Sequence, residues 1–482
     1  MNQVPALVVR AALLCLVVHG AIALTFLQLG RAVPDATLPI ALAVGSILAW
    51  LAPAPRAHVH DPSRASRLVV GLGVALLAIA GAMLVVGSFA TPARTWDGAT
   101  SWELRARAFA AAPTLEQPFF RDPGVYGHTR EYPVLQPLLL AGLARLGLGM
   151  DGARLLFPLL WLLLLGVVGD AWRRLGVARA SRAWLLPAFA LTPMLVDPTM
   201  GGVDSGFADL LALLALTGAA AGLATRDVVA TAAGVFLAVV SKPEGLLHAV
   251  ILATVAWCAG EFRMLCAVTL GGIAGAVAWL PLYAGLVGES LAVPELVACL
   301  ATTAVPILVS GALLARYAPR PALRLGVLAV GAGLALTGAW LLAPAFEGLG
   351  ARSGVLGVYL DGFERAKARL VELPRILGWL AAHAVHPRHY GLIAWLLLAL
   401  AFASRKSPAP PPAGERRVLA TLLCLGLASV TLPFLVSPEP DLGHHVRSSM
   451  DRLLLHWLGV AWLLAGACWP NPQAPAETGL TR

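Results

Sequence analysis

Charged residues are scarce in this sequence: Asp, Glu, Lys and Arg together account for only 13% of the 482 residues. Hydrophobic residues account for 59%, and this balance excludes a soluble globular domain. Lysine is the rarest charged residue, because the chain has only Lys242, Lys367 and Lys406. The formal net charge of +9 therefore comes mainly from arginine.

Cysteine is also rare, and its pattern excludes two kinds of site. The sequence has no CxxC pair and no Cys/His spacing typical of a zinc finger. All six cysteines fall inside or at the ends of apolar runs: Cys15, Cys258, Cys266, Cys299, Cys424 and Cys468. We expect them to be packing residues that form neither disulfides nor a zinc site.

Long apolar runs are what the chain has in abundance. About 20 apolar residues cross a hydrocarbon core of ~30 Å, and about fourteen runs approach that length, from Ala6–Leu29 to Leu453–Cys468. The runs are continuous rather than alternating, which favours helices over a barrel. The expected fold class is an all-α polytopic membrane protein with about fourteen transmembrane helices and interfacial amphipathic helices in its outer loops.

The arginines gather in short loops between the runs, as is typical of cytoplasmic loops. They indicate orientation, so we expect no nucleic-acid partner. The basic loops lie around 56–67, 173–182, 316–324 and 405–417. Because the first two loops must share a side, one run between them must not cross. Tyr132–Gly149 is short and contains prolines, so we expect it to be interfacial or re-entrant.

The topology divides the chain into four parts. Residues 1–66 form a two-span hairpin and a basic cytoplasmic loop, and residues 67–260 form a membrane module whose first large outer loop is 91–131. Residues 261–469 form a second membrane module, and residues 470–482 form a disordered tail. Both termini are expected in the cytoplasm.

The stretch "TWDGATSWELRARAFAA" begins the first large outer loop. Its spacing of Trp102, Ala106 and Phe109 predicts a helix with one apolar side, supported by an i, i+4 pair of Glu103 and Arg107. Asp97 comes directly before this helix. It is either a helix cap or a functional carboxylate at the membrane surface.

Three further charged residues are expected inside the membrane: Asp209, Lys242 and Glu244. Asp209 begins the apolar run in "GGVDSGFADLLALLAL", where a carboxylate is costly and hence a functional candidate, whereas Asp204 suits a turn. The stretch "SKPEGLLH" puts Lys242 and Glu244 between two runs too short to span comfortably, so they should be recessed. They either pair locally or present a compact cation to a phosphate.

Weaker signals lie near the same outer face. His128, Glu131 and Tyr132 lie at the start of the interfacial helix, where they are expected to line the same cavity, with Tyr132 as a substrate-binding residue. Arg447 and Arg452 lie at the outer end of the last span, where they suit either headgroup anchoring or phosphate binding. Three histidines also cluster in "HAVHPRHY", but Pro387 predicts that they are not aimed together as metal ligands; they are His383, His386 and His389.

The order of these stretches resembles the GT-C superfamily of glycosyltransferases, which take a sugar from a polyprenyl-phosphate carrier. The stretches that carry the resemblance are "TWDGATSW", "REYPVLQPLLLAGLARLG", "FADLLALLAL", "SKPEGLL" and "SSMDRLLLHW". It is closest to the bacterial protein-mannosyltransferase-like and aminoarabinose-transferase-like branches. The chain differs in having two extra spans before the catalytic loop and no large C-terminal outer domain.

The resemblance implies roles for several residues. Asp97 matches the catalytic aspartate of the first outer loop and Asp209 a second acidic residue at a helix mouth, so both are expected to be catalytic, while Glu131 lies near a metal-binding carboxylate of some members. A divalent metal ion is thus an optional cofactor. The implied partners are a polyprenyl-phosphate-linked sugar donor, membrane lipids and a glycan, lipid or protein acceptor. The implied location is the bacterial inner membrane, with the active site extracytoplasmic.

The residues also support a chemical role directly. Asp97 would act as the base for the acceptor hydroxyl, while Lys242 and Arg452 would bind the departing phosphate. Two other classes stay open. A transporter or flippase of lipid-linked sugars needs charges on both sides of the midplane, whereas those in this sequence concentrate outside. A non-catalytic membrane scaffold would tolerate loss of the recessed charges.

Overall fold

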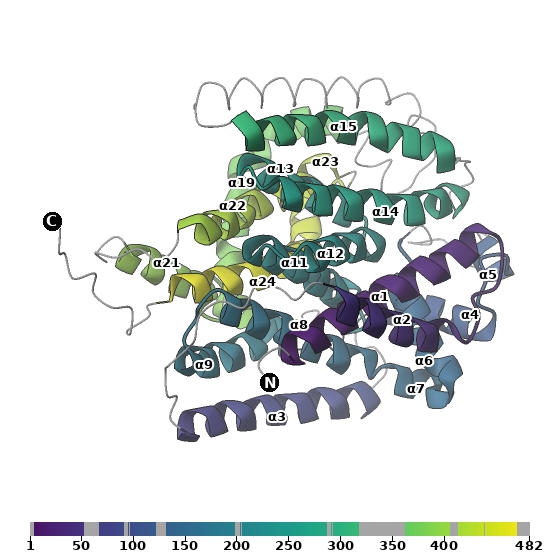
Figure 1. The fold of residues 1–482 in the computed structure, drawn as a ribbon, viewed down its shortest axis with the longest axis horizontal. Coiled ribbons are helices and arrows are strands. Elements are labelled where there is room, and N and C mark those ends of the chain that lie inside the picture. The colour runs from purple at the N-terminus through teal and green to yellow at the C-terminus, as the bar shows by residue number, and fades with distance from the viewer. Residues whose placement is uncertain are drawn as a thin grey trace.

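The computed structural model describes residues 4–52, 67–90, 95, 97–121, 132–197, 203, 205–286, 291, 293–317, 362–404, 413–437 and 439–469. Throughout these residues the regular secondary structure is helical (Figure 1). Most of the long helices run roughly parallel or antiparallel to one another, with α4 and α5 at one end of the bundle. The expected all-α fold class is confirmed for this part of the chain.

The helices have the following bounds. They are α1 Val4–Gln28, α2 Thr37–Leu51, α3 Arg67–Ala90, α4 Leu104–Ala111, α5 Pro118–Arg121, α6 Leu135–Leu143, α7 Gly149–Ala153, α8 Leu156–Arg174, α9 Arg179–Ala190, α10 Pro193–Val196, α11 Asp209–Thr225, α12 Val228–Ser241, α13 Gly245–Cys258, α14 Phe262–Leu286, α15 Val293–Tyr317, α18 Gly362–Arg369, α19 Leu373–Ala384, α20 Pro387–Tyr390, α21 Ile393–Ser404, α22 Ala413–Ser429, α23 Leu432–Val436 and α24 Leu442–Cys468. Single π-helical turns occupy Gly98–Glu103 and Ala144–Leu148, and a 3₁₀ turn occupies Leu370–Glu372.

Five helical segments among the described residues are long and apolar enough to cross a membrane. They are Ala6–Gln28, Arg67–Phe89, Leu156–Arg174, Phe262–Leu286 and Gly414–Val436. Several shorter apolar helices accompany them, including α2, α11, α12 and α13. These segments indicate a membrane protein, while the number of about fourteen spans stays a prediction.

Helix α11 lies at the centre of the bundle. Every residue from Asp209 to Ala224 is buried, and the helix packs against α8, α12, α13, α22 and α24. A helix that is apolar all round is stable only where neighbours cover it on all sides. Its 17 residues rise about 25 Å, less than the ~30 Å of a hydrocarbon core.

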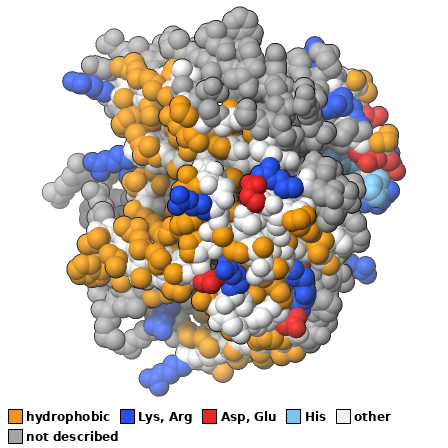
Figure 2. All heavy atoms as spheres, turned by 90° about the vertical axis from the view of Figure 1, so that its right-hand side faces the viewer, with side chains coloured by type: hydrophobic (Ala, Val, Ile, Leu, Met, Phe, Trp, Pro, Cys, Tyr) orange, Lys and Arg blue, Asp and Glu red, His pale blue; other side chains and the backbone are white. Residues whose placement is uncertain are grey.

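Helix α3 has the opposite character and lies at the edge of the bundle (Figure 1). Its outward side chains are apolar and exposed, among them Leu68, Val74 and Met83. Apolar exposure of this extent suits contact with lipid. The end of the molecule that carries α4 and α5 also has broad hydrophobic areas, interrupted by charged side chains of both signs (Figure 2).

The segment Tyr132–Gly149 forms only a short, broken helix. Helix α6 has nine residues and is followed by a π-helical turn in which Gly147 has a φ of 100°. Nine residues rise about 14 Å, too little to cross a hydrocarbon core. The length agrees with the expectation that this segment does not span.

The helix predicted after Asp97 is present. Its Trp102, Ala106 and Phe109 are buried, and the expected Glu103–Arg107 pair forms with a nitrogen–oxygen distance of 2.6 Å. Trp102 packs against Phe207 and Tyr132, just before the start of α11 and of α6 respectively. These contacts hold the segment from Gly98 to Ala111 over the end of the central helix.

Candidate functional site

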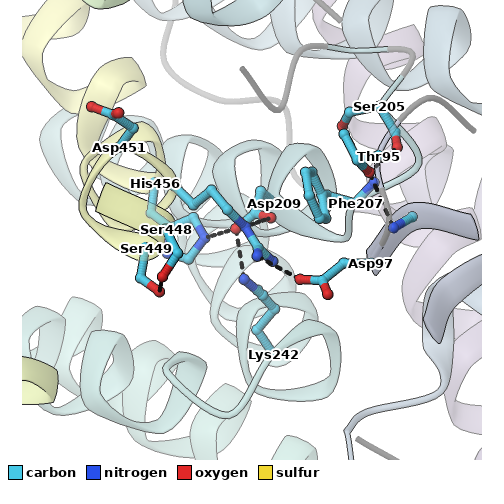
Figure 3. Close-up of polar contacts among 12 residues, drawn as sticks. Thr95, Asp97, Ser205, Phe207, Asp209, Lys242, Ser448, Ser449, Asp451 and His456 are labelled. Atoms are coloured by element: carbon cyan, nitrogen blue, oxygen red, sulfur yellow. Dashed lines mark hydrogen bonds and ion pairs between the residues drawn. The ribbon is translucent and has the colours of Figure 1, made fainter. Parts of the chain in front are cut away.

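Asp209 is the centre of a buried polar cluster at one end of α11 (Figure 3). Its carboxylate has no exposed surface and contacts three side chains from two other helices. Oδ1 accepts from Lys242 Nζ at 2.6 Å and lies 2.9 Å from His456 Nε2, and Oδ2 accepts from Arg452 Nε at 3.1 Å. An isolated carboxylate is very costly to bury, so this set of partners accounts for its place in an apolar bundle.

A tight hairpin between α12 and α13 positions Lys242 in this cluster. Lys242 is the C-terminal cap residue of α12, and α13 begins three residues later. Gly245 makes the hairpin possible, because a β-carbon there would overlap the carbonyl of Ala238. Lys242 is buried and bonds Asp209 on α11, so the alternative of a local pair with Glu244 is wrong.

Arg452 connects the buried cluster to Asp97, which directly precedes the segment from Gly98 to Ala111. It lies on α24, and its guanidinium stacks 3.9 Å from the ring centroid of Phe207. While Nε donates to Asp209, Nη1 donates to Asp97 Oδ2 at 2.8 Å. One arginine therefore bridges two carboxylates that are far apart in the sequence.

Asp97 is the most accessible member, with a side chain that is 36% exposed. It occupies the cap position of the helical segment after it but makes no capping hydrogen bond. The interpretation of Asp97 as a helix cap is therefore wrong. Thr95 Oγ1 donates to the Ser205 carbonyl at 2.8 Å, and a β-carbon on Gly98 would overlap the same carbonyl, so the loop packs closely against the chain before α11.

Two histidines of the cluster were not predicted. His456 follows Arg452 by four residues on α24, which puts both on one face, and this i, i+4 spacing is the signal that could have identified it. His248 on α13 lies behind it, with ring centroids 5.3 Å apart. Nδ1 of both rings is buried without a hydrogen-bond partner among the described residues.

The cluster combines two carboxylates, a lysine, an arginine and two histidines, of which His456 contacts Asp209 and His248 packs against His456. Asp209 and Lys242 are buried, whereas Asp97 and Arg452 are partly open to the outside of the bundle. Such a graded arrangement presents cationic groups to an anion that enters from the open side and keeps a carboxylate beside it.

Three other predicted site residues are Glu244, Arg447 and Tyr132, of which Tyr132 lies close enough to Arg452 to act on its charge. Glu244 is partly buried, and its Oε2 has no hydrogen-bond partner in the described part of the chain. Arg447 is exposed near Asp441 at the start of α24, so its predicted role in substrate binding is not supported by its position. Tyr132 packs with Trp102, and its carbonyl accepts from Arg105.

Several predicted residues lie outside the described residues. They are His128, Glu131 and Asp204. The metal ligand that the resemblance implies, Glu131, therefore stays a prediction.

The prediction that Pro387 keeps the three histidines apart is wrong for two of them. His383 Nδ1 and His389 Nδ1 lie 2.8 and 2.7 Å from Asp451 Oδ1. Pro387 ends the preceding helix and begins the single turn α20, and this reversal brings His389 back toward His383. His386 is the cap residue of α20, and its Nδ1 accepts from the Arg388 backbone.

The premise that charges concentrate outside also needs correction. At the far end of α11, Asp227 Oδ2 accepts from Arg10 at 2.8 Å and from Arg174 at 2.7 Å, and Arg174 also pairs with Asp170. Burial raises the pKa of Asp227, but the hydrogen bonds from Arg174 and Arg10 outweigh it and lower the pKa below its ordinary value. Buried charges therefore lie at both ends of the central helix.

Comparison with known proteins gives no relative on which to base a function. Because no protein-family model, no curated protein and no solved structure matches this chain, its function has to be inferred from the geometry above.

Proposed function

We propose that this protein is a membrane glycosyltransferase that takes a sugar from a polyprenyl-phosphate carrier and transfers it to an acceptor on the extracytoplasmic face. One observation carries the proposal: Arg452 joins the accessible Asp97 to the buried Asp209–Lys242 pair. A transfer of this kind needs both a carboxylate to receive the acceptor proton and cations to stabilise a departing phosphate. The resemblance to the GT-C superfamily points to the same reaction.

The phosphate of the donor would compete with Asp97 for Arg452. With donor bound, Arg452 would bind the phosphate through the Nη1 group that pairs with Asp97 in this structure. Lys242 would add a second positive charge from its buried position beside Asp209. Asp209 is a positioning residue, because it holds Lys242, Arg452 and His456 in their places. Release of Asp97 from the ion pair leaves its carboxylate beside the bound donor.

The chemical step follows from these positions. The acceptor hydroxyl oxygen bonds to the anomeric carbon of the sugar, and the bond from that carbon to the phosphate oxygen breaks. The hydroxyl proton passes to Asp97, and the electron pair of the broken bond stays on polyprenyl phosphate, where the cations stabilise it. The positive charge that develops on the sugar ring is oxocarbenium-like, by analogy with glycosidases.

The depth of the cluster suits a donor held in lipid. A soluble sugar nucleotide would have no reason to seek cations at membrane depth, whereas a polyprenyl phosphate can keep its isoprenoid among lipid chains while its head group enters the bundle. The proposed location is accordingly the bacterial inner membrane, with the site open to the outside.

Mass spectrometry of cell-envelope glycans, glycolipids and glycoproteins tests the proposal. Cells without the protein should lack one hexose or pentose on a specific envelope molecule, and wild-type protein should restore it whereas Asp97→Asn should not. Glu116→Gln is a matched control, because Glu116 is an exposed carboxylate of the same predicted outer loop, 91–131. An envelope with unchanged glycans in all four strains would contradict the proposal.

A carrier of lipid-linked sugars is the second candidate, since charges are buried at both ends of α11. The cytoplasmic pair of Asp227 and Arg10 is tightly closed, however, and the hollow that they line has a volume of only about 30 Å³. A carrier would move the intact donor between leaflets, so the fate of the phosphate–sugar bond separates the two candidates.

A further inference from the structure

Three side chains from three helices converge at a second place on the outer end of the bundle. His383 comes from the last turn of α19, His389 from α20 and Asp451 from α24. The three ligand atoms, both Nδ1 atoms and one carboxylate oxygen, all lie within 4.8 Å of one another. We propose that they bind a divalent transition-metal ion of the zinc class.

This group is separate from the cluster around Asp209. Asp451 precedes Arg452 on α24, but its side chain points away from Asp209 (Figure 3). Two features hold the turn that carries His389 against α24. The Tyr390 hydroxyl donates to the Asp451 carbonyl, and Gly391 ends α20 with a φ of 61°. The proposal therefore stands independently of the proposed glycosyl transfer.

The donor set selects the kind of metal. Two imidazoles and one carboxylate suit zinc and its neighbours in the first transition series, whereas calcium and magnesium prefer oxygen ligands only. Tetrahedral zinc with bonds of about 2.0–2.2 Å needs ligand atoms roughly 3.3 Å apart. The histidine nitrogens lie 2.7 and 2.8 Å from the carboxylate oxygen, so small outward side-chain rotations would admit the ion.

The exposure of the three side chains suits a metal ion that keeps one coordination position free for water or another external ligand. The three side chains are 19%, 16% and 21% exposed, so an ion can enter from the outside and keep a water or an external ligand. Bound metal would fasten α19 and α20 to α24 at the residue beside Arg452. Metal occupancy would thus stabilise the outer end of the last helix.

Zinc binding to the purified full-length protein tests the proposal. The protein is isolated through a histidine-free tag, stripped with EDTA, dialysed and titrated with Zn²⁺ against a chromophoric chelator. We expect one equivalent bound with a Kd of about 1 μM or tighter, together with a melting temperature that rises with zinc. His383→Gln, His389→Gln and Asp451→Asn should each weaken binding by about 100-fold or more.

His386→Gln is the matched control, because His386 stacks on His389 but its Nδ1 is directed to the Arg388 backbone. It should bind zinc as the wild type does. Absence of a saturable equivalent in the wild type would overturn the proposal, as would equal binding by the wild type and the Asp451→Asn protein. Co²⁺ gives a readout that needs no variant: an absorption band typical of tetrahedral or five-coordinate nitrogen and oxygen ligation is expected, and a purely octahedral aqua spectrum would overturn the assignment.

Discussion

Asp209 is the residue on which the outer cluster depends. It carries a charge at a position with no exposed surface, and two cations and a histidine surround it. Breaking a buried pair from one side is costly because it leaves the other charge without compensation, whereas removing both charges is often tolerated. This asymmetry gives a way to separate the structural role of Lys242 from its functional one.

Lys242→Met should destabilise the protein by up to about 3–5 kcal/mol, since Asp209 then loses its closest cation. Combining it with Asp209→Asn should recover most of the melting temperature. Turnover should stay low in the double variant, because the phosphate of the proposed donor still lacks the positive charge of Lys242. Normal turnover in the double variant would mean that the pair is structural only.

Asp97→Asn should behave differently from these buried variants. The side chain is partly exposed and makes no capping hydrogen bond, so the melting temperature should change little. Loss of a general base should lower turnover by roughly 10²–10⁴. Thermal melting and turnover of the same purified preparation check this, with Glu116→Gln as the control, and a large drop in melting temperature with normal turnover would contradict it.

At the scale of elements, the outer segment from Gly98 to Ala111 is held in place by Glu103. Its Oε1 accepts from Arg154 at 2.7 Å, which fixes the segment against the chain that leads into α8, and from Arg107 at 2.6 Å. Burial raises the pKa of Glu103, but the hydrogen bonds from Arg154 and Arg107 outweigh it, so the pKa lies below the ordinary value of 4.5. The carboxylate therefore contributes stability in its charged form.

Glu103→Gln should lower the stability of the protein by about 1–3 kcal/mol at neutral pH. Because the folded-state pKa is lowered, this contribution is complete above pH 4.5 and is lost as the pH falls through the folded-state value. The melting curves of wild type and variant should therefore differ at pH 7 and converge in acid. The exposed Glu116 gives the control substitution, and a difference that grows toward low pH would contradict the assignment.

The sequence predicted helices and the central site better than it predicted partners. Apolar run length was enough to identify α3 and α11, and the cost of intramembrane charge was enough to select Asp209 and Lys242. Partner choice depends on which helices pack together, and local spacing does not contain that information. Lys242 was therefore expected either beside Glu244 or facing a phosphate, and its bond to Asp209, 33 positions earlier in the chain, was not predicted.

The contacts of His383, His389 and Asp451 could not be predicted from local sequence spacing either. A proline was expected to destroy the helical register, and it does, but the reversed chain then brings His389 to His383 and Asp451. Their meeting depends on α24, which contributes Asp451 from 62 positions after His389. His456 could have been found from its spacing to Arg452, since both lie on one face of a helix.

Across the bundle, we expect the two ends of α11 to face opposite sides of the membrane. Cysteine-accessibility labelling in a background without the six native cysteines tests this. Gly98 is unsuitable as a probe because a side chain there would overlap Ser205, so Glu116 and Ser448 are better outer positions. They should label from outside, and the exposed positions Arg179 and Gly414 only after permeabilisation. Labelling of position 179 from outside would show that the segment Tyr132–Gly149 has been assigned wrongly.

If the cluster around Asp209 breaks the bond between sugar and polyprenyl phosphate, the purified protein should separate the two parts of the donor. Purified protein in liposomes receives a polyprenyl-phosphate sugar labelled in the sugar, together with envelope extract from cells that lack the protein. The wild type should move label onto an acceptor and release polyprenyl phosphate in equal amount, and Asp97→Asn should do so roughly 10²–10⁴ times more slowly. Label that stays on the intact lipid, whether or not it changes leaflet, would contradict this expectation.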